Sequence, residues 1–223
     1  MQLFFLQLDS AAAKTSVEME SLWSVLMKGG VLMIPLALLF VAAVFFFIER
    51  LIAIRKAANI EDNFMNIIRD HIMTGNVAAA RSLSKNTNHP VAKMIDKGIQ
   101  RIGKPIDAIE NSMNNVGKLE MYKMEKNLSI LSIIARIAPL FGFLGTIIGM
   151  VQLFRGISAS SDFTLSTIAD GIYVKMITSA TGLIIGIITF IGYSYLNAQI
   201  DKTVNKMEVA SAEFLDILQE PHK

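Results

Sequence analysis

The segment A-P-L-F-G-F-L-G-T-I-I-G-M-V-Q-L-F at residues 138–154 decides the fold of this chain. Together with Ile137 it forms an uncharged apolar run. Since about 20 residues at 1.5 Å rise cross a ~30 Å hydrocarbon core, this run meets the length criterion for a membrane helix. Small residues at short intervals let another helix backbone approach closely. The residues that indicate close packing here are Pro139, Gly142, Gly145 and Gly149, and Thr146 adds a hydroxyl near mid-membrane.

Two further uncharged stretches, at 31–48 and 176–200, also have the length of a membrane helix. The stretch at 31–48 is apolar at every position and is predicted to face lipid. The other stretch begins M-I-T-S-A-T-G-L-I-I-G, which resembles the first segment in its small and hydroxyl residues. Its notable residues are Thr178, Ser179, Thr181, Gly182 and Gly186. The sequence therefore predicts an all-α membrane protein with three transmembrane helices, two of which extend into a cytoplasmic helical region.

The composition excludes several classes of function. Of the 223 residues, 52% are hydrophobic and only 18% are charged, below the roughly 25% usual in soluble domains. A net charge of +2 is too balanced for a nucleic-acid-binding protein. Because the chain has no cysteine, neither a disulfide nor a thiolate metal site is possible. The three histidines are not spaced as a pair of metal ligands. We expect no cofactor and no enzymatic activity.

The distribution of Lys and Arg predicts the orientation in the membrane. Residues 49–128 carry thirteen of them, while the segments before residue 31 and around 155–169 carry few. The positive-inside rule therefore places the N-terminus outside and the C-terminus in the cytoplasm. The predicted segments are 1–30 (outside, with an amphipathic interfacial helix), 31–50 (transmembrane), 51–128 (cytoplasmic helical domain), 129–154 (transmembrane), 155–169 (loop on the outside), 170–197 (transmembrane) and 198–223 (cytoplasmic C-terminal helix).

Within the cytoplasmic segment, residues 60–104 are predicted to form short helices. Gly75 and Asn76 end one helix and cap the next, and Pro90 opens a third. After Pro105 an apolar pattern continues into the membrane segment without a clear breaker. The pattern predicts one continuous helix over 105–154, in which Gly117 is the weak point.

The polar residues within the apolar segments are the candidate functional residues. Each hydroxyl either bonds to the carbonyl four residues before it or lines a narrow polar path. No Asp or Glu lies inside the apolar segments, since Glu49 and Asp170 lie at their edges. A proton path generally needs a titratable group, so a conducting protein of this kind would borrow its acid from a partner. Lys175, one turn from Ser179, either extends to the membrane surface or pairs with that acid.

The residues 138–154 and the stretch A-D-G-I-Y-V-K-M-I-T-S-A-T-G-L-I-I-G-I at 169–187 resemble the paired signature of the MotA/TolQ/ExbB proton-channel family, most closely its ExbB members. The resemblance implies a ring-forming homopentamer around the single-span helices of an ExbD-like partner dimer, whose helix supplies an essential Asp. It also implies that the pore hydroxyls are Thr146 and Ser179. Several family members carry a Glu at the position of Val174, so this chain departs from the pattern there.

The resemblance predicts a multi-pass protein of the bacterial inner membrane that uses protons to energise a TonB-like protein and thereby transport across the outer membrane. It also implies that the outside is the periplasm, so that residues 1–30 and the loop at 155–169 are periplasmic. A TolQ-like role in envelope maintenance, a motility motor and a non-conducting membrane scaffold are the alternatives. A secondary transporter is disfavoured because the chain has three apolar segments and no repeat halves.

Overall fold

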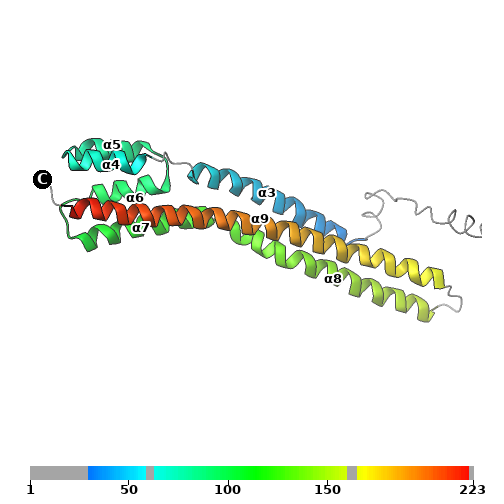
Figure 1. Cartoon of the computed structure of the whole chain (residues 1–223). Helices are drawn as coiled ribbons and strands as arrows, with labels where there is room; N and C mark the ends of the chain where they lie inside the picture. Colours follow the sequence, from blue (N-terminus) through cyan, green and yellow to red (C-terminus); the bar gives the residue numbers. More distant parts are fainter. Residues whose placement is uncertain (1–29, 59–62, 160–164, 221–223) are drawn as a thin grey trace, which may run out of the picture.

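The computed structural model describes residues 30–58, 63–159 and 165–220, and within these ranges every regular element is an α-helix. The amphipathic interfacial helix predicted before residue 30 lies outside the described residues. The helices are α3 (Met33–Ala58), α4 (Phe64–Met73), α5 (Val77–Asn86), α6 (Pro90–Ile99), α7 (Ile106–Glu125), α8 (Leu128–Ala159) and α9 (Leu165–Gln219). Figure 1 shows an elongated molecule in which α9 runs almost from end to end.

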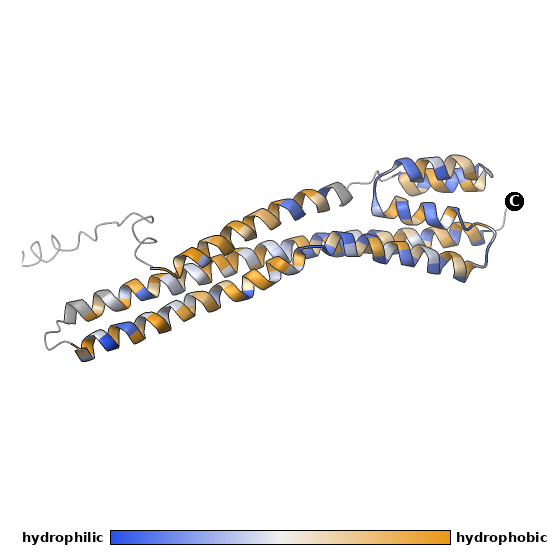
Figure 2. Ribbon diagram, turned by 180° about the vertical axis from the view of Figure 1, so that it is seen from behind, coloured by the Kyte–Doolittle hydropathy of each residue, from blue (hydrophilic) through white to orange (hydrophobic). Residues whose placement is uncertain are grey.

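The three predicted membrane helices are present as α3, α8 and α9. Each contains a segment long and apolar enough to cross a membrane: Met33–Arg55, Leu128–Ala159 and part of Gly171–Gln219. In one half of the molecule α8 and α9 lie antiparallel along each other, and α3 packs against both (Figure 1). Apolar residues dominate this half and polar residues the other half (Figure 2). We call α3, α8 and residues 165–197 of α9 the membrane half.

The helix α3 faces its surroundings on one side only. Its exposed apolar side chains include a series at three- or four-residue spacing, namely Ile34, Leu38, Val41, Phe45, Ile48 and Ile52. On the other side, Leu36 is fully buried against Ala138 and Ile185. One face of this segment therefore packs on protein, and only the other face is left for lipid to contact. The uniform apolarity did not show which face is which.

The helix α9 contains 55 residues and is about 80 Å long at 1.5 Å per residue. Its last part leaves the membrane half and packs against α4, α6 and α7. We call α4–α7 and residues 198–219 of α9 the distal bundle. No break separates the predicted membrane helix from the predicted C-terminal helix.

The segment predicted as a loop at 155–169 is partly helical. The helix α8 continues to Ala159 and α9 begins at Leu165. The prediction ended each helix at the end of its apolar run. Helix propagation beyond that run adds one hydrogen bond per residue and requires no apolar side chain.

Local capping signals determine the short helices of the distal bundle. Gly75 adopts a left-handed conformation (φ 72°) after α4, and the Asn76 side chain accepts a hydrogen bond from the Ala79 N–H at the start of α5. His89 caps α6, whose first residue is Pro90. These boundaries confirm the predicted short helices. The core beneath them contains the fully buried side chains Ile68, Ile95, Ile109, Met113, Phe214 and Ile217.

The continuous helix predicted over 105–154 is wrong, because the chain breaks between α7 and α8. Asn127 lies at the break with φ 64°, a left-handed conformation that Asn adopts more readily than other non-glycine residues. Gly117, the predicted weak point, lies inside α7. A Cβ atom there would lie 3.4 Å from Met207 Cε and 3.6 Å from Met94 Sδ, ordinary van der Waals contacts, so an alanine would also fit at this position.

Two residues of α3 hold the break in place. The buried Arg50 side chain donates to the Lys123 carbonyl at the end of α7 (3.2 Å) and to the Glu49 carboxylate (2.6 Å). Asn127 donates its side-chain amide to the other Glu49 oxygen (3.3 Å). The I-E-R-L sequence at 48–51 therefore fastens α3 to the α7–α8 junction.

Candidate functional site

The interface between α8 and α9 in the membrane half is built mostly from small residues. On α8 the buried positions recur at three or four residues, at Leu131, Ala135, Ala138, Gly142, Gly145 and Gly149. On α9 the buried positions include Thr178, Gly182, Ile185 and Gly186. We call Gly142, Gly145 and Gly149 together with Gly182 and Gly186 the glycine interface.

At the centre of the glycine interface the two backbones are in direct contact. A Cβ atom on Gly182 would lie 2.6 Å from the Ala138 carbonyl oxygen and 2.8 Å from Gly142 Cα. A Cβ atom on Gly142 would lie 2.9 Å from the Thr178 carbonyl oxygen. These distances are shorter than van der Waals contact with atoms that cannot rotate away. Only glycine therefore fits at these two positions.

Neighbouring residues extend the contact in both directions. Gly186 faces the ring of Pro139, with 2.5 Å between its notional Cβ and Pro139 Cγ. Gly145 faces the methyl group of the buried Thr178 (2.7 Å to Cγ2). Gly149 faces the methylene groups of the half-buried Lys175. The apolar stem of Lys175 therefore lies across α8, which leaves its ammonium group at the edge of the pair.

The candidate hydroxyls differ in their surroundings. The Thr146 hydroxyl lies 3.3 Å from the Gly142 carbonyl oxygen of its own helix and 3.5 Å from the Lys175 carbonyl oxygen of α9. The Thr181 hydroxyl donates to the Ile177 carbonyl at 2.9 Å, within α9. Ser179 is half-buried beside the glycine interface, and no side-chain hydrogen bond of its hydroxyl is seen within the described residues. Thr146 and Lys175 are thus brought together, whereas Thr181 contacts its own helix.

The apolar core of the membrane half carries hydroxyls and one ammonium group but no acid. Residues 137–154 and 171–200 contain neither Asp nor Glu. Among the described residues no three His, Asp or Glu side chains lie close enough together to hold a metal ion. This arrangement can orient water or a partner's polar group, while a titratable carboxylate must come from elsewhere.

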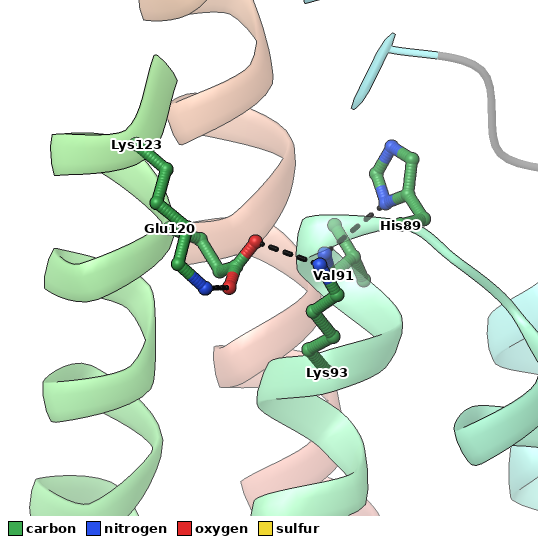
Figure 3. Close-up of polar contacts among 5 residues, drawn as sticks. All are labelled: His89, Val91, Lys93, Glu120 and Lys123. Atoms are coloured by element: carbon green, nitrogen blue, oxygen red, sulfur yellow. Dashed lines mark hydrogen bonds and ion pairs between the residues drawn. The ribbon is translucent and has the colours of Figure 1, made fainter. Parts of the chain in front are cut away.

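The distal bundle contains a second polar cluster, which sequence reasoning missed. The Glu120 carboxylate is 8% exposed and accepts from Lys93 of α6 (3.0 Å) and Lys123 of α7 (2.6 Å), as Figure 3 shows. Burial alone would raise the pKa of Glu120, but the hydrogen bonds from Lys123 and Lys93 outweigh it and hold the pKa below its usual value. The carboxylate therefore stays ionised and joins α6 to α7.

His89, in the same region, is almost fully buried, and it lies at the start of α6 beside Val91 (Figure 3). Its Nδ1 atom accepts the Val91 N–H at 3.1 Å, so the proton of the neutral ring lies on Nε2. Burial, with the positive charges of Lys206 and Lys93, lowers the pKa of His89 to about 4. The sequence signal was its position directly before Pro90, where a helix cap is expected.

These features define the class of the protein as a multi-pass helical membrane protein with a tightly packed helix pair. The MotA/TolQ/ExbB proton channel family model matches residues 86–209, more than half of the chain. The chain belongs to this family. The match covers most of α9 and all of α6, α7 and α8.

Individual relatives carry ExbB and TolQ names. A biopolymer transport protein ExbB homolog of Methanothermobacter thermautotrophicus is 33% identical over 135 residues, which cover 60% of this chain and 47% of that protein. A biopolymer transport protein of Vibrio cholerae is 34% identical over 90 residues, 40% of each chain. The Tol-Pal system protein TolQ of Pseudomonas aeruginosa is 28% identical over 113 residues, 51% of this chain and 49% of its own. The chain spans less than half the length of each of these relatives.

Proposed function

We propose that this chain is an ExbB-like subunit of a proton-conducting energy transducer in the bacterial inner membrane. The observation that carries the proposal is the glycine interface, a closely packed helix pair with hydroxyls beside it and no carboxylate in its apolar core. Such a pair can hold polar groups at fixed depth but cannot itself bind and release the transported proton. The acid is therefore supplied by a single-span partner of the ExbD type.

The assembly that follows from this proposal is a homopentameric ring around a partner dimer. Its support in a single chain is the exposed apolar surface of α8 and α9, which includes Phe143, Ile147, Leu183 and Ile187. Copies of the chain, the partner helices and lipid would together cover this surface. The distal bundle would lie in the cytoplasm, and the ring would transmit work to a TonB-like protein.

Within the ring, Thr146 and Ser179 would orient water or the partner's acid along the proton path, with Thr178 and Thr181 beside them. The ammonium group of Lys175 would pair with that acid when it is ionised. One elementary charge that crosses 100 mV releases about 2.3 kcal/mol, so each step of the partner relative to the ring is small or uses several protons.

There are three alternative functions, and two of them are each favoured by one observation. The similarity to a TolQ protein of the Tol-Pal system favours a role in envelope maintenance, and a motility motor would use the same helices. The bonds of Thr146 and Thr181 to carbonyls of their own helices favour a non-conducting scaffold, in which the hydroxyls only satisfy the backbone.

The proposal is tested by removing single oxygen atoms and measuring proton flux into vesicles that contain the chain and its partner. Thr146→Val and Ser179→Ala should each lower the flux about tenfold, the effect of one hydrogen bond to a charged group. Thr189→Val is the matched control, since this buried hydroxyl of α9 donates only to the Ile185 carbonyl (2.7 Å). Flux unchanged from the wild type in all three variants would mean that the hydroxyls of Thr146 and Ser179 only contribute to packing.

Lys175→Met separates the two interpretations of the ammonium group. Methionine keeps most of the stem that packs on Gly149 and removes the charge. If Lys175 pairs with the partner's acid, the pH dependence of flux should shift while assembly stays intact. An unchanged pH dependence would mean that the side chain only extends to the membrane surface.

A further inference from the structure

A polar cavity of about 660 Å³ lies at the junction of α7 and α8, beside α9. The side chains that give the cavity its chemistry are Lys126, Ser129, Ser132, Arg136, Tyr193 and Asn197. One carboxylate, that of Glu125, also lines it, so the cavity carries two positive charges against one negative charge. None of these groups belongs to the glycine interface or to the polar cluster around Glu120.

The cavity lies at the depth of lipid headgroups. The helix α8 has 32 residues and is about 48 Å long, whereas a ~30 Å hydrocarbon core needs only about 20 residues. The uncharged run at 137–154 fills that core, which places Arg136 and the two serines before it at the membrane surface. Tyr193 lines the same cavity from α9, and tyrosine is enriched at this level of membrane proteins.

The exposed Arg136 side chain is directed toward the start of α8, where it donates to Ser132 Oγ at 2.7 Å. That hydroxyl keeps its own proton as a donor, and the guanidinium keeps further N–H groups. With the exposed Lys126, these donors suit a phosphodiester, which arginine and serine recognise through charge-assisted hydrogen bonds.

An apolar surface continues from the cavity toward the membrane centre. On α8 it consists of exposed side chains at three- or four-residue spacing after Arg136, namely Leu140, Phe143, Ile147 and Val151. On α9, Phe190, Ile187 and Leu183 are exposed over the same depth. An acyl chain that lies along this surface would place its headgroup in the cavity.

We propose that this cavity binds the headgroup of an anionic phospholipid from the adjacent leaflet. Basic pockets between membrane helices on the cytoplasmic side commonly bind such headgroups. The phosphodiester contacts Arg136, Ser132 and Lys126, and one acyl chain lies along α8. Lipid binding at this cavity would be expected whether or not the protein conducts protons.

The test uses the full-length protein in detergent, with lipid retention measured by native mass spectrometry. The probes are phosphatidylglycerol and, as the neutral-headgroup comparison, phosphatidylcholine. Phosphatidylglycerol should be retained in preference, and Arg136→Ala and Lys126→Ala should each weaken its retention about tenfold. Arg101→Ala is the control, because Arg101 is an exposed cation outside the cavity.

Three outcomes would overturn the proposal. The first is equal retention of the two lipids, or equal losses in the Arg101 control. The second is displacement of phosphatidylglycerol by an excess of inorganic phosphate, which would indicate a site for a soluble anion. The third is a change in oligomeric state with Arg136→Ala at unchanged lipid retention, which would indicate that a second copy of the chain covers the cavity.

Discussion

The membrane half and the distal bundle are held together by opposite kinds of side chain. In the membrane half, α8 and α9 meet through glycines, and backbone contacts backbone. In the distal bundle, large side chains such as Phe214, Met113 and Ile95 fill the space between helices, and the ion pairs of Glu120 join α6 to α7. The two regions share α9, so one helix takes part in both kinds of packing.

The difference follows from the solvent of each region. Lipid tails are as apolar as leucine, so burial of large side chains between membrane helices yields little, and close van der Waals contact between small residues replaces it. In water, each buried apolar side chain contributes about 1.5–3 kcal/mol. The contrast predicts that substitutions in the two regions will fail for different reasons.

The largest expected effect is loss of a core side chain from the distal bundle. Phe214 is fully buried, and Phe214→Ala should lower the free energy of unfolding by about 4 kcal/mol through lost burial and a cavity. Amide hydrogen exchange should show lost protection in α4–α7 and retained protection around Gly182. Val209→Ala, at an exposed position of the same helix, should have little effect. Equal loss of protection in both regions would mean that they unfold as one unit.

Acidification should also destabilise the distal bundle selectively. Because the pKa of His89 is lowered from 6.5 to about 4 on folding, the unfolded chain binds a proton that the folded chain does not bind between these pH values. The free energy of unfolding should therefore fall by roughly 3 kcal/mol as the pH drops from 6.5 to 4. His89→Asn keeps a capping group without titrating and should flatten this dependence.

Glu120 adds a second loss at lower pH. Its folded pKa is held below the usual 4.5, so its contribution is present above that value and is lost as the pH falls through the folded pKa. Amide exchange measured against pH in the wild type and in His89→Asn separates the contributions of His89 and Glu120. If His89→Asn leaves the loss between pH 6.5 and 4 unchanged, another group causes it.

In the glycine interface, adding even a single methyl group should lower the free energy of unfolding. Gly182→Ala brings a methyl group within 2.6 Å of the Ala138 carbonyl oxygen, and we expect a cost of about 2 kcal/mol from forced separation of the helices. The control is Gly156→Ala on α8. A Cβ atom at this position would have no neighbouring atom within 4 Å, so alanine should raise the free energy of unfolding by up to about 1 kcal/mol. Thermal unfolding in detergent measures both, and equal effects would contradict the tight interface.

The sharpest comparison uses Gly98 of α6, where a methyl group would meet Phe214 Cε1 at the same distance, 2.6 Å. The next neighbour is Met113 Sδ at 2.7 Å. Since both neighbours are side chains that can shift, Gly98→Ala should cost only about 1 kcal/mol. The measurement is the thermal unfolding of Gly98→Ala and of Gly182→Ala under the same conditions. A cost at Gly98 equal to or above that at Gly182 would show that backbone contact is not the deciding factor.

The elements that could be predicted from the sequence depend on local signals. Three uncharged runs predicted α3, α8 and α9, and Gly75, Asn76 and Pro90 predicted the short helices, because apolar length and capping act within a few residues. The glycines of α8 and α9 likewise indicated a close helix pair. The roles of Thr146, Ser179 and Lys175 stay predictions.

Features that depend on residues far apart in the sequence could not be predicted. The break at Asn127 carries no proline or glycine, and it is held by Glu49 and Arg50, more than seventy positions earlier. The contact between Lys175 and Gly149 and the pairing of Glu120 with Lys93 likewise join different helices. Sequence spacing alone does not show which helices meet, so these contacts became visible only in the folded chain.

The central claim is that the chain conducts protons with an acid supplied by a partner. The most direct measurement compares proton flux into liposomes that contain this protein alone, the protein with its single-span partner, and the protein with a partner whose membrane Asp is changed to Asn. We predict flux only with the intact partner. Equal and negligible flux in all three preparations, from complexes shown to be assembled, would contradict the account and favour a scaffold.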